Sequence, residues 1–202
     1  IFLNQLGSAG SADGQFASPY DIAIAPNGNI YVADLGHAEI QYFNSQGNYL
    51  GKWGRWGSGD GQFGSGSVSD VAVATNENGE VVVYVTDTAN DRIQYFDENG
   101  VYKGQWGSNG SENGQFIDPI GIAIAPNGDV YVSEKNGHRI QRFNATGDYI
   151  SKWGSLGSGD GEFNGPTNIT IHSNSDVYVT DSSNHRIQYF NAEGGYLGQW
   201  GS

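Results

Sequence analysis

The sequence predicts an all-β protein, a β-propeller of four four-stranded antiparallel blades with one surplus outer strand at the N-terminus. Three observations support this fold: short motifs return four times along 202 residues, Gly is abundant at 32 residues, and aromatic residues make up 13% of the chain. Disordered chains are poor in aromatic residues, whereas glycine turns between short apolar runs are typical of β-sheet proteins. The length fits one repeat array.

Four motifs recur four times each along the chain, and the first three of them recur at steps of 53, 47 and 47 residues. Tyr-Val-x-Asp/Glu begins at Tyr31, Tyr84, Tyr131 and Tyr178; Ile-Gln-Tyr/Arg-Phe begins at Ile40, Ile93, Ile140 and Ile187. Trp-Gly begins at Trp53, Trp106, Trp153 and Trp200, and Gly-Gln/Glu-Phe ends at Phe16, Phe63, Phe116 and Phe163. The longer step comes from residues inserted in the second repeat, which we expect in loops.

Each repeat contains four strand signals. In the first repeat they cover residues 22–25, 30–33, 40–43 and 49–53. Asn27-Gly28 between the first two is a strong hairpin signal, and Gly47 marks a turn between the last two. We therefore expect blades at residues 8–54, 55–107, 108–154 and 155–202, preceded by an outer strand at residues 1–7.

Residues 1–7 align with residues 48–54, so they have the pattern of an outer strand. The last repeat has its own outer strand over residues 195–200, which makes one outer strand surplus. Three explanations remain open: the chain is an excerpt of a longer propeller, several chains combine into one ring, or the surplus strand pairs with a neighbouring molecule. The residues expected in strand exchange are Ile1, Phe2, Leu3, Asn4, Gln5 and Leu6.

The order Asp-Gly-Gln-Phe, Pro-x-Gly-Ile-Ala-Ile, Val-Tyr-Val-x-Asp and Asn-His-Arg-Ile-Gln resembles the NHL repeat. The fullest copies lie at residues 119–124 and 181–188, and the resemblance covers essentially the whole chain. It implies a propeller, most often of six blades, that serves as a protein-interaction, RNA-binding or sensor module. A minority relative is a metal-dependent amidating lyase, and the fold alone does not choose among these functions.

The net charge of −13 disfavours nucleic acid as a partner, because an acidic surface repels phosphates. The sequence contains no run of 18 apolar residues, so we expect no membrane insertion. It contains no Cys, which excludes disulfides and thiolate sites. Three sequons make Asn109, Asn144 and Asn168 candidate glycosylation sites if the chain is exported. Together with the acidic charge, these features lead us to expect an extracellular or cell-surface protein.

An acidic residue at the end of the second strand signal is followed five residues later by an arginine in three repeats. The pairs are Asp87 with Arg92, Glu134 with Arg139, and Asp181 with Arg186. A catalytic residue would not need one copy per blade, so we interpret the pairs as structural ion pairs. In the first repeat Asp34 faces Glu39 instead, which predicts an acidic spot on blade 1.

The start of the first strand of each blade is the best position for a ligand, because this strand lines the central channel of a propeller. Asp21, Asp70 and Asn168 lie there and offer the oxygen ligands that Ca²⁺ prefers; the alternative is a solvated polar rim. We expect no other cofactor. The four histidines, His37, His138, His172 and His185, are expected in loops that do not converge on one metal.

No catalytic residue is identified. The function expected from the sequence is a non-enzymatic extracellular structural or interaction scaffold that binds another protein or itself, with strand exchange by the N-terminal strand as the route to self-assembly. The alternative is a metal-dependent lyase or hydrolase whose site lies at the mouth of the channel.

Overall fold

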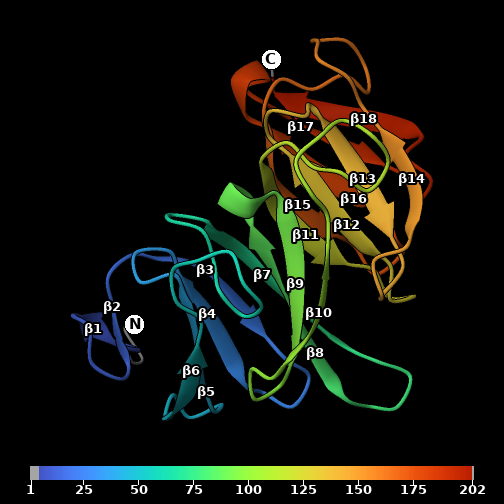
Figure 1. Ribbon diagram of the computed structural model, residues 1–202. Helices are drawn as coiled ribbons and strands as arrows, with labels where there is room; N and C mark the ends of the chain where they lie inside the picture. Colours follow the sequence, from blue (N-terminus) through green and yellow to red (C-terminus); the bar gives the residue numbers. More distant parts are fainter. Residues whose placement is uncertain (1–4, 202) are drawn as a thin grey trace.

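A computed structural model describes residues 5–201 and confirms four antiparallel four-stranded blades (Figure 1). Blade 1 contains β3 (Pro19–Ile24), β4 (Ile30–Asp34), β5 (Glu39–Phe43) and β6 (Tyr49–Trp53). Blade 2 contains β7 (Val68–Thr75), β8 (Val81–Asp87), β9 (Arg92–Asp97) and β10 (Tyr102–Trp106). Blade 3 contains β11 (Pro119–Ile124), β12 (Val130–Glu134), β13 (Arg139–Phe143) and β14 (Tyr149–Trp153). Blade 4 contains β15 (Pro166–Ile171), β16 (Val177–Asp181), β17 (Arg186–Phe190) and β18 (Tyr196–Gly201).

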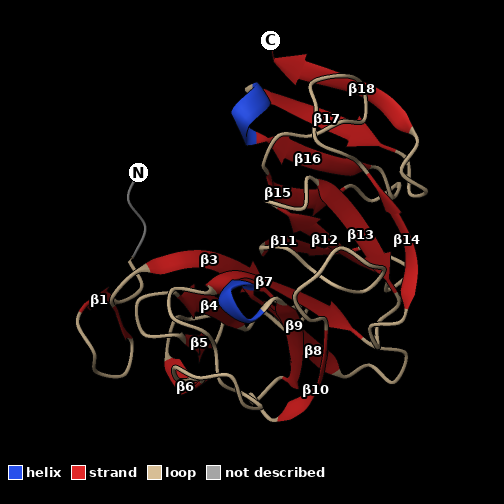
Figure 2. Cartoon of the chain, turned by 45° about the horizontal axis from the view of Figure 1, so that its top comes forward, coloured by secondary structure: helices blue, strands red, loops and turns tan. Residues whose placement is uncertain are grey.

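The four blades form an open arc rather than a closed ring (Figure 2). Each blade packs face to face with the next, and the first strands β3, β7, β11 and β15 contact one another in that order along the inner side. Blade 1 and blade 4 lie at opposite ends of the arc (Figures 1 and 2). Each of them therefore has one face that no other described blade covers.

A tryptophan anchors each of the three junctions between consecutive blades. Trp53 of blade 1 packs on Phe96 of blade 2, with ring centroids 5.5 Å apart. The same contact joins Trp106 to Phe143 and Trp153 to Phe190, at 5.7 Å in both cases. Because aromatic side chains bury large apolar areas, this repeated contact supplies much of the stability of the arc.

A buried tyrosine adds one hydrogen bond to each junction. The hydroxyl groups of Tyr31, Tyr84 and Tyr131 donate to main-chain carbonyl oxygens in the next blade, each at 3.0 Å. The acceptors are Glu98, Ala145 and Ala192, which occupy the same turn of successive blades. The hydrogen bonds satisfy polar groups that would otherwise be costly to bury.

The N-terminal segment begins with a parallel strand pair, β1 (Ser8–Ala9) with β2 (Gln15–Phe16). Of the residues expected in strand exchange, residues 1–4 lie outside the described residues, and Gln5 and Leu6 belong to no strand. Leu6 packs against the cluster of Phe16, Val32 and Phe43 on blade 1. Leu6 therefore occupies on blade 1 the position that is equivalent to that of Trp53 on blade 2.

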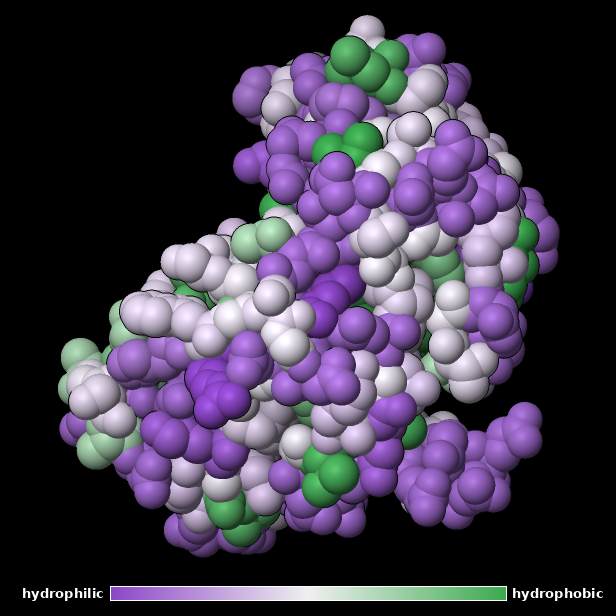
Figure 3. Space-filling view, viewed as in Figure 1, coloured by the Kyte–Doolittle hydropathy of each residue, from purple (hydrophilic) through white to green (hydrophobic). Residues whose placement is uncertain are grey.

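Two short 3-10 helices, η1 (Thr88–Asn90) and η2 (Ser182–Asn184), connect the second and third strands of blades 2 and 4. Within residues 5–201 no helix is long and apolar enough to cross a membrane. The face of the molecule in Figure 3 is mostly hydrophilic, with hydrophobic residues in small separate groups. The buried apolar residues form clusters between neighbouring blades.

Candidate functional site

The first strands of the blades converge on a small pocket of about 170 Å³ at the inner side of the arc. It is lined by Tyr20, Asp21, Ser69, Asp70, Ile120, Thr167 and Asn168. The three residues predicted at the channel mouth are thus brought together. Whether they bind Ca²⁺ stays a prediction.

The two carboxylates of this pocket bond to main-chain amides of neighbouring strands. Asp21 Oδ2 accepts a hydrogen bond from the amide of Val71 at 3.0 Å. Asp70 accepts from the amide of Val71 at 2.8 Å and from that of Ile122 at 2.9 Å. Since Asp21 reaches blade 2 and Asp70 reaches blade 3, both side chains have a structural role in joining blades.

Burial raises the pKa of Asp70 to about 9, and a hydrogen bond to Asp21 contributes in the same direction. The raised pKa favours the protonated form of Asp70 when no ion is bound, because burial penalises the charged carboxylate and Asp21 lies beside it. A protonated carboxyl is a weak ligand for a hard cation. A cation that binds both carboxylates would have to displace this proton.

Asp70→Asn is expected to flatten the pH dependence of stability. The pKa of Asp70 is higher in the folded state than in the unfolded chain, so the folded protein binds the proton more tightly and loses stability as pH rises from about 4 to about 9. The loss approaches about 1.4 kcal/mol per pH unit. Urea unfolding at about pH 5 and pH 8 would measure it, and parallel curves for the variant and the original chain would contradict the assignment.

The three predicted acid–arginine pairs form buried ion pairs at the end of the second strand of blades 2, 3 and 4. The Nε atoms of Arg92, Arg139 and Arg186 lie 2.7, 2.6 and 2.8 Å from the carboxylates of Asp87, Glu134 and Asp181. The rest of each guanidinium donates to carbonyl oxygens of the loop that enters the blade, for example Gly59 and Gln62 in blade 2. The arginine thus holds the entry loop against the blade.

Blade 1 replaces this pair with a different cluster. Asp34 is opposite Glu39 in the β4–β5 ladder, as the sequence predicts. His37 Nδ1 lies 2.8 Å from Asp34 Oδ2 and 3.9 Å from Glu39 Oε1. Lys52 Nζ approaches Glu39 at 3.3 Å. His37 lies in the turn between β4 and β5, as expected for a loop histidine, and its spacing from Asp34 and Glu39 is the sequence signal of this cluster.

The remaining predicted residues lie apart from this cluster. His138 accepts a hydrogen bond from the amide of Gly165, His172 bonds to Asn174, and His185 is exposed. Of the sequon residues, Asn109 and Asn168 are exposed and Asn144 is half-buried, with side-chain amides of Asn109 and Asn144 bonded to Asp91 and Asp148. Their glycosylation stays a prediction.

Comparison with known proteins identifies the repeat. The family model described as "NHL repeat" matches residues 116–143 and 163–190, which run from the end of the entry loop to the third strand of blades 3 and 4. Blades 3 and 4 therefore carry NHL repeats. Protein brain tumor of Drosophila melanogaster is 37% identical over 83 residues, which cover 41% of the chain and 7% of that protein.

Solved structures resemble the NHL arc over nearly its whole length. A virginiamycin B lyase from Staphylococcus aureus has a TM-score of 0.65 and 21% identity, covering 92% of the chain and 56% of the lyase. Kuenenia stuttgartiensis hydrazine synthase has a TM-score of 0.65 and 13% identity, covering 96% of the chain and 53% of the synthase. The chain thus spans about half the length of these structures, and at such identities the likeness concerns the fold alone.

Proposed function

We propose that this NHL propeller is a non-enzymatic protein-interaction scaffold that associates end to end with a second copy of itself. NHL propellers supply rigid surfaces for protein interactions. The main observation in support is that the exposed faces of blade 1 and blade 4 are equivalent to the two surfaces that pack together at each internal blade junction.

The face at the start of the arc, on blade 1, is apolar and exposed. Ile22 on β3 is 57% exposed, whereas its equivalents Val71, Ile122 and Ile169 are only 3–4% exposed because the preceding blade covers them. Tyr20 and Ile24 beside it are 62% and 69% exposed. A groove of about 310 Å³, lined by Leu6, Phe16, Pro19, Tyr20, Asp21, Ile22 and Val32, lies on this face.

The face at the end of the arc, on blade 4, carries the complementary residues. Trp200 is 53% exposed and Ile187 is 39% exposed, while Ile40, Ile93 and Ile140 at the position of Ile187 are fully buried. Docking blade 4 of one copy on blade 1 of another would repeat the internal junction. Trp200 would pack on Phe43, and Tyr178 would donate to the carbonyl oxygen of Ser45, as the equivalent residues do three times within the chain.

Such an interface joins two different faces, so it generates a ring if the rotation closes and a filament if it does not. Leu6 occupies the position on blade 1 that Trp200 of the second copy would take. Trp200 buries more area than Leu6, and β18 is paired with β17 over five residues, so we favour docking of an intact blade 4 that displaces Leu6.

Strand exchange is the other form of this assembly. In it the N-terminal strand would pair with β17 of the second copy and place Leu6 where Trp200 packs, so that β18 would be released. The support for strand exchange is the contact of Leu6 with blade 1, which holds the segment in the position of a preceding outer strand; docking of the intact blade 4 remains the form that we propose.

We expect a mass above 21.6 kDa for the chain in sedimentation equilibrium, and the monomer mass for Trp200→Asp and for Ile22→Asp. A mixture of the two variants retains one intact pair of faces and is therefore expected to form a heterodimer. Trp56→Asp is the matched control, because Trp56 is 64% exposed but lies on neither end face.

The two forms of assembly respond oppositely to two changes. Deleting residues 1–7 leaves docking intact but abolishes strand exchange, whereas Trp200→Asp abolishes docking and leaves exchange intact. A monomer for the unmodified chain over the whole accessible concentration range would overturn the proposal in both forms.

We also propose that the protein works outside the cell, on the support of its negative charge, its sequons and its lack of Cys. A metal-dependent lyase or hydrolase at the inner pocket is the alternative function. It has weaker support, because both carboxylates of the pocket accept hydrogen bonds from backbone amides and so have a structural role. Glycan analysis of the secreted chain and a divalent-metal assay of the Asp70→Asn variant would test these two points.

A further inference from the structure

The cluster of Asp34, His37 and Glu39 on blade 1 brings three metal-ligating side chains together. One oxygen or nitrogen atom from each residue lies within 4.8 Å of the others. Asp34 is fully buried and Glu39 is 8% exposed, while the side chain of His37 is 27% exposed. The cluster is therefore enclosed by the blade but can be reached from solvent at the imidazole.

The sister blades show that this position is built for a cation. In blades 2, 3 and 4 the equivalent carboxylate binds the guanidinium of an arginine, which also contacts carbonyl oxygens of the entry loop. In blade 4 these carbonyls belong to Ser158, Gly159 and Glu162. Their equivalents in blade 1 are Ser11, Ala12 and Gln15, so the same loop borders the Asp34 cluster.

In blade 1 the position of this arginine is occupied by Glu39. The substitution changes the local charge from neutral, for an acid with an arginine, to two carboxylates. Lys52 compensates in part, since its Nζ lies 3.3 Å from Glu39 Oε2 and 3.8 Å from Asp13 Oδ1. Buried carboxylates in excess of their cations are unfavourable, so the cluster has a strong electrostatic preference for a further positive charge.

We propose that Asp34, His37 and Glu39 bind one divalent transition-metal ion of the Zn²⁺ class. An imidazole nitrogen together with two carboxylate oxygens is a ligand set that Zn²⁺ accepts, and Zn–ligand distances of about 2 Å place ligand atoms about 3.3 Å apart in a tetrahedron. The His37–Asp34 and His37–Glu39 separations are 2.8 and 3.9 Å, and all three pairs of ligand atoms lie within 4.8 Å. Closing the site therefore requires the three side chains to move toward a common centre.

The metal would do in blade 1 what arginine does in the other blades, namely hold the end of the second strand, the start of the third strand and the entry loop together. Because blade 1 carries an end face of the arc, the ion would stabilise the blade on which the proposed association depends. The metal site itself does not rest on that association.

The test is isothermal titration of the 202-residue chain with ZnCl₂ alone, paired with thermal unfolding. We expect one equivalent bound and a rise in the unfolding temperature, since an ion that binds only the folded state stabilises it. Glu39→Arg restores the pattern of the sister blades, so it should fold normally by circular dichroism yet bind Zn²⁺ about 100-fold more weakly or not at all.

Two further variants report on the site without depending on Glu39→Arg. His37→Asn removes one ligand and should weaken binding by about tenfold or more. Lys52→Gln introduces the residue that blades 2 and 4 have at this position, removes the competing ammonium, and should strengthen binding by about three- to tenfold. Equal Zn²⁺ affinity in the chain and in Glu39→Arg or His37→Asn would overturn the proposal, as would binding of CaCl₂ but not ZnCl₂.

Discussion

Replacing Asp87 with Ala is expected to lower the free energy of unfolding by about 3–5 kcal/mol. The Asp87 carboxylate is fully buried and accepts hydrogen bonds from Arg92 Nε at 2.7 Å, the amide of Gly64 at 2.8 Å and the hydroxyl of Ser67 at 2.8 Å. Removing it leaves a guanidinium buried without a counter-charge and a loop amide without an acceptor. Urea unfolding of the purified variant would measure the loss.

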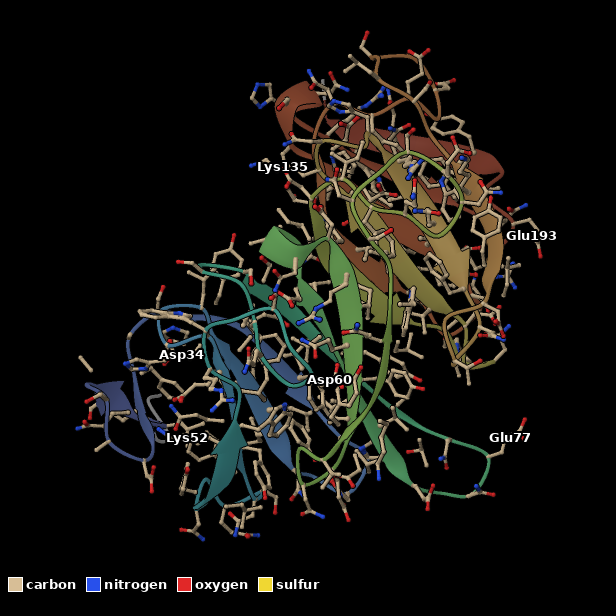
Figure 4. The ribbon with its side chains drawn as sticks, viewed as in Figure 1. Asp34, Lys52, Asp60, Glu77, Lys135 and Glu193 are labelled. Atoms are coloured by element: carbon tan, nitrogen blue, oxygen red, sulfur yellow. The ribbon has the colours of Figure 1, made fainter. Side chains whose placement is uncertain are left out.

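Two further variants serve as controls for the loss of stability in Asp87→Ala. Glu77→Ala removes a carboxylate from the exposed turn between β7 and β8, at the protruding end of blade 2 in Figure 4, and should change stability by about 0.5 kcal/mol or less. Asp87→Leu combined with Arg92→Met removes both charges and should recover part of the loss, but not the part due to Gly64 and Ser67. A loss below about 1 kcal/mol for Asp87→Ala would show that the pair contributes little.

Gly147→Ala is expected to destabilise the arc by about 3 kcal/mol or more. Gly147 has a φ of +92°, which strains any residue with a Cβ, and a Cβ at this position would lie 2.5 Å from the indole of Trp106. The tryptophan that anchors the junction between blades 2 and 3 would therefore have to move. Thermal or urea unfolding gives the size of the effect.

Gly128→Ala separates the two causes within the same blade. Gly128 has a φ of +89°, but a Cβ there would meet no heavy atom within 4 Å. Its substitution should cost only the backbone strain, about 1–2 kcal/mol. Equal losses for the two variants would mean that the tryptophan contact adds nothing to the requirement for glycine at position 147.

The strands and hairpins could be predicted from sequence because each is encoded four times. Local patterns such as Asn27-Gly28 and the Tyr-Val-x-Asp motif define pairings within a blade, and these were confirmed. The curvature of the arc could not be predicted in this way, because it depends on how whole blades pack. For the same reason the exposure of Ile22 and Trp200, which have the same pattern as their buried equivalents, became visible only in the structure.

The candidate sites also combine features that the sequence predicts with features that only the packing of the blades determines. The Asp21, Asp70 and Asn168 pocket was predictable, because equivalent strand starts must meet near the axis of a propeller. The raised pKa of Asp70 was not, since it depends on burial and on the proximity of Asp21. The contact of His37 with Asp34 was not predicted, because comparison among repeats drew attention to residues that recur, whereas this histidine belongs to the one blade that differs.

The hydrogen bonds from Tyr31, Tyr84 and Tyr131 end on main-chain carbonyl oxygens, and this has a consequence for how the surface can change. Every amino acid supplies that acceptor, so the residue receiving the bond is free to vary; in this chain it is Glu98 once and alanine twice. New side chains can therefore be displayed along the rim of the arc, and a partner surface can diversify there, while the attachment of one blade to the next is left unaltered.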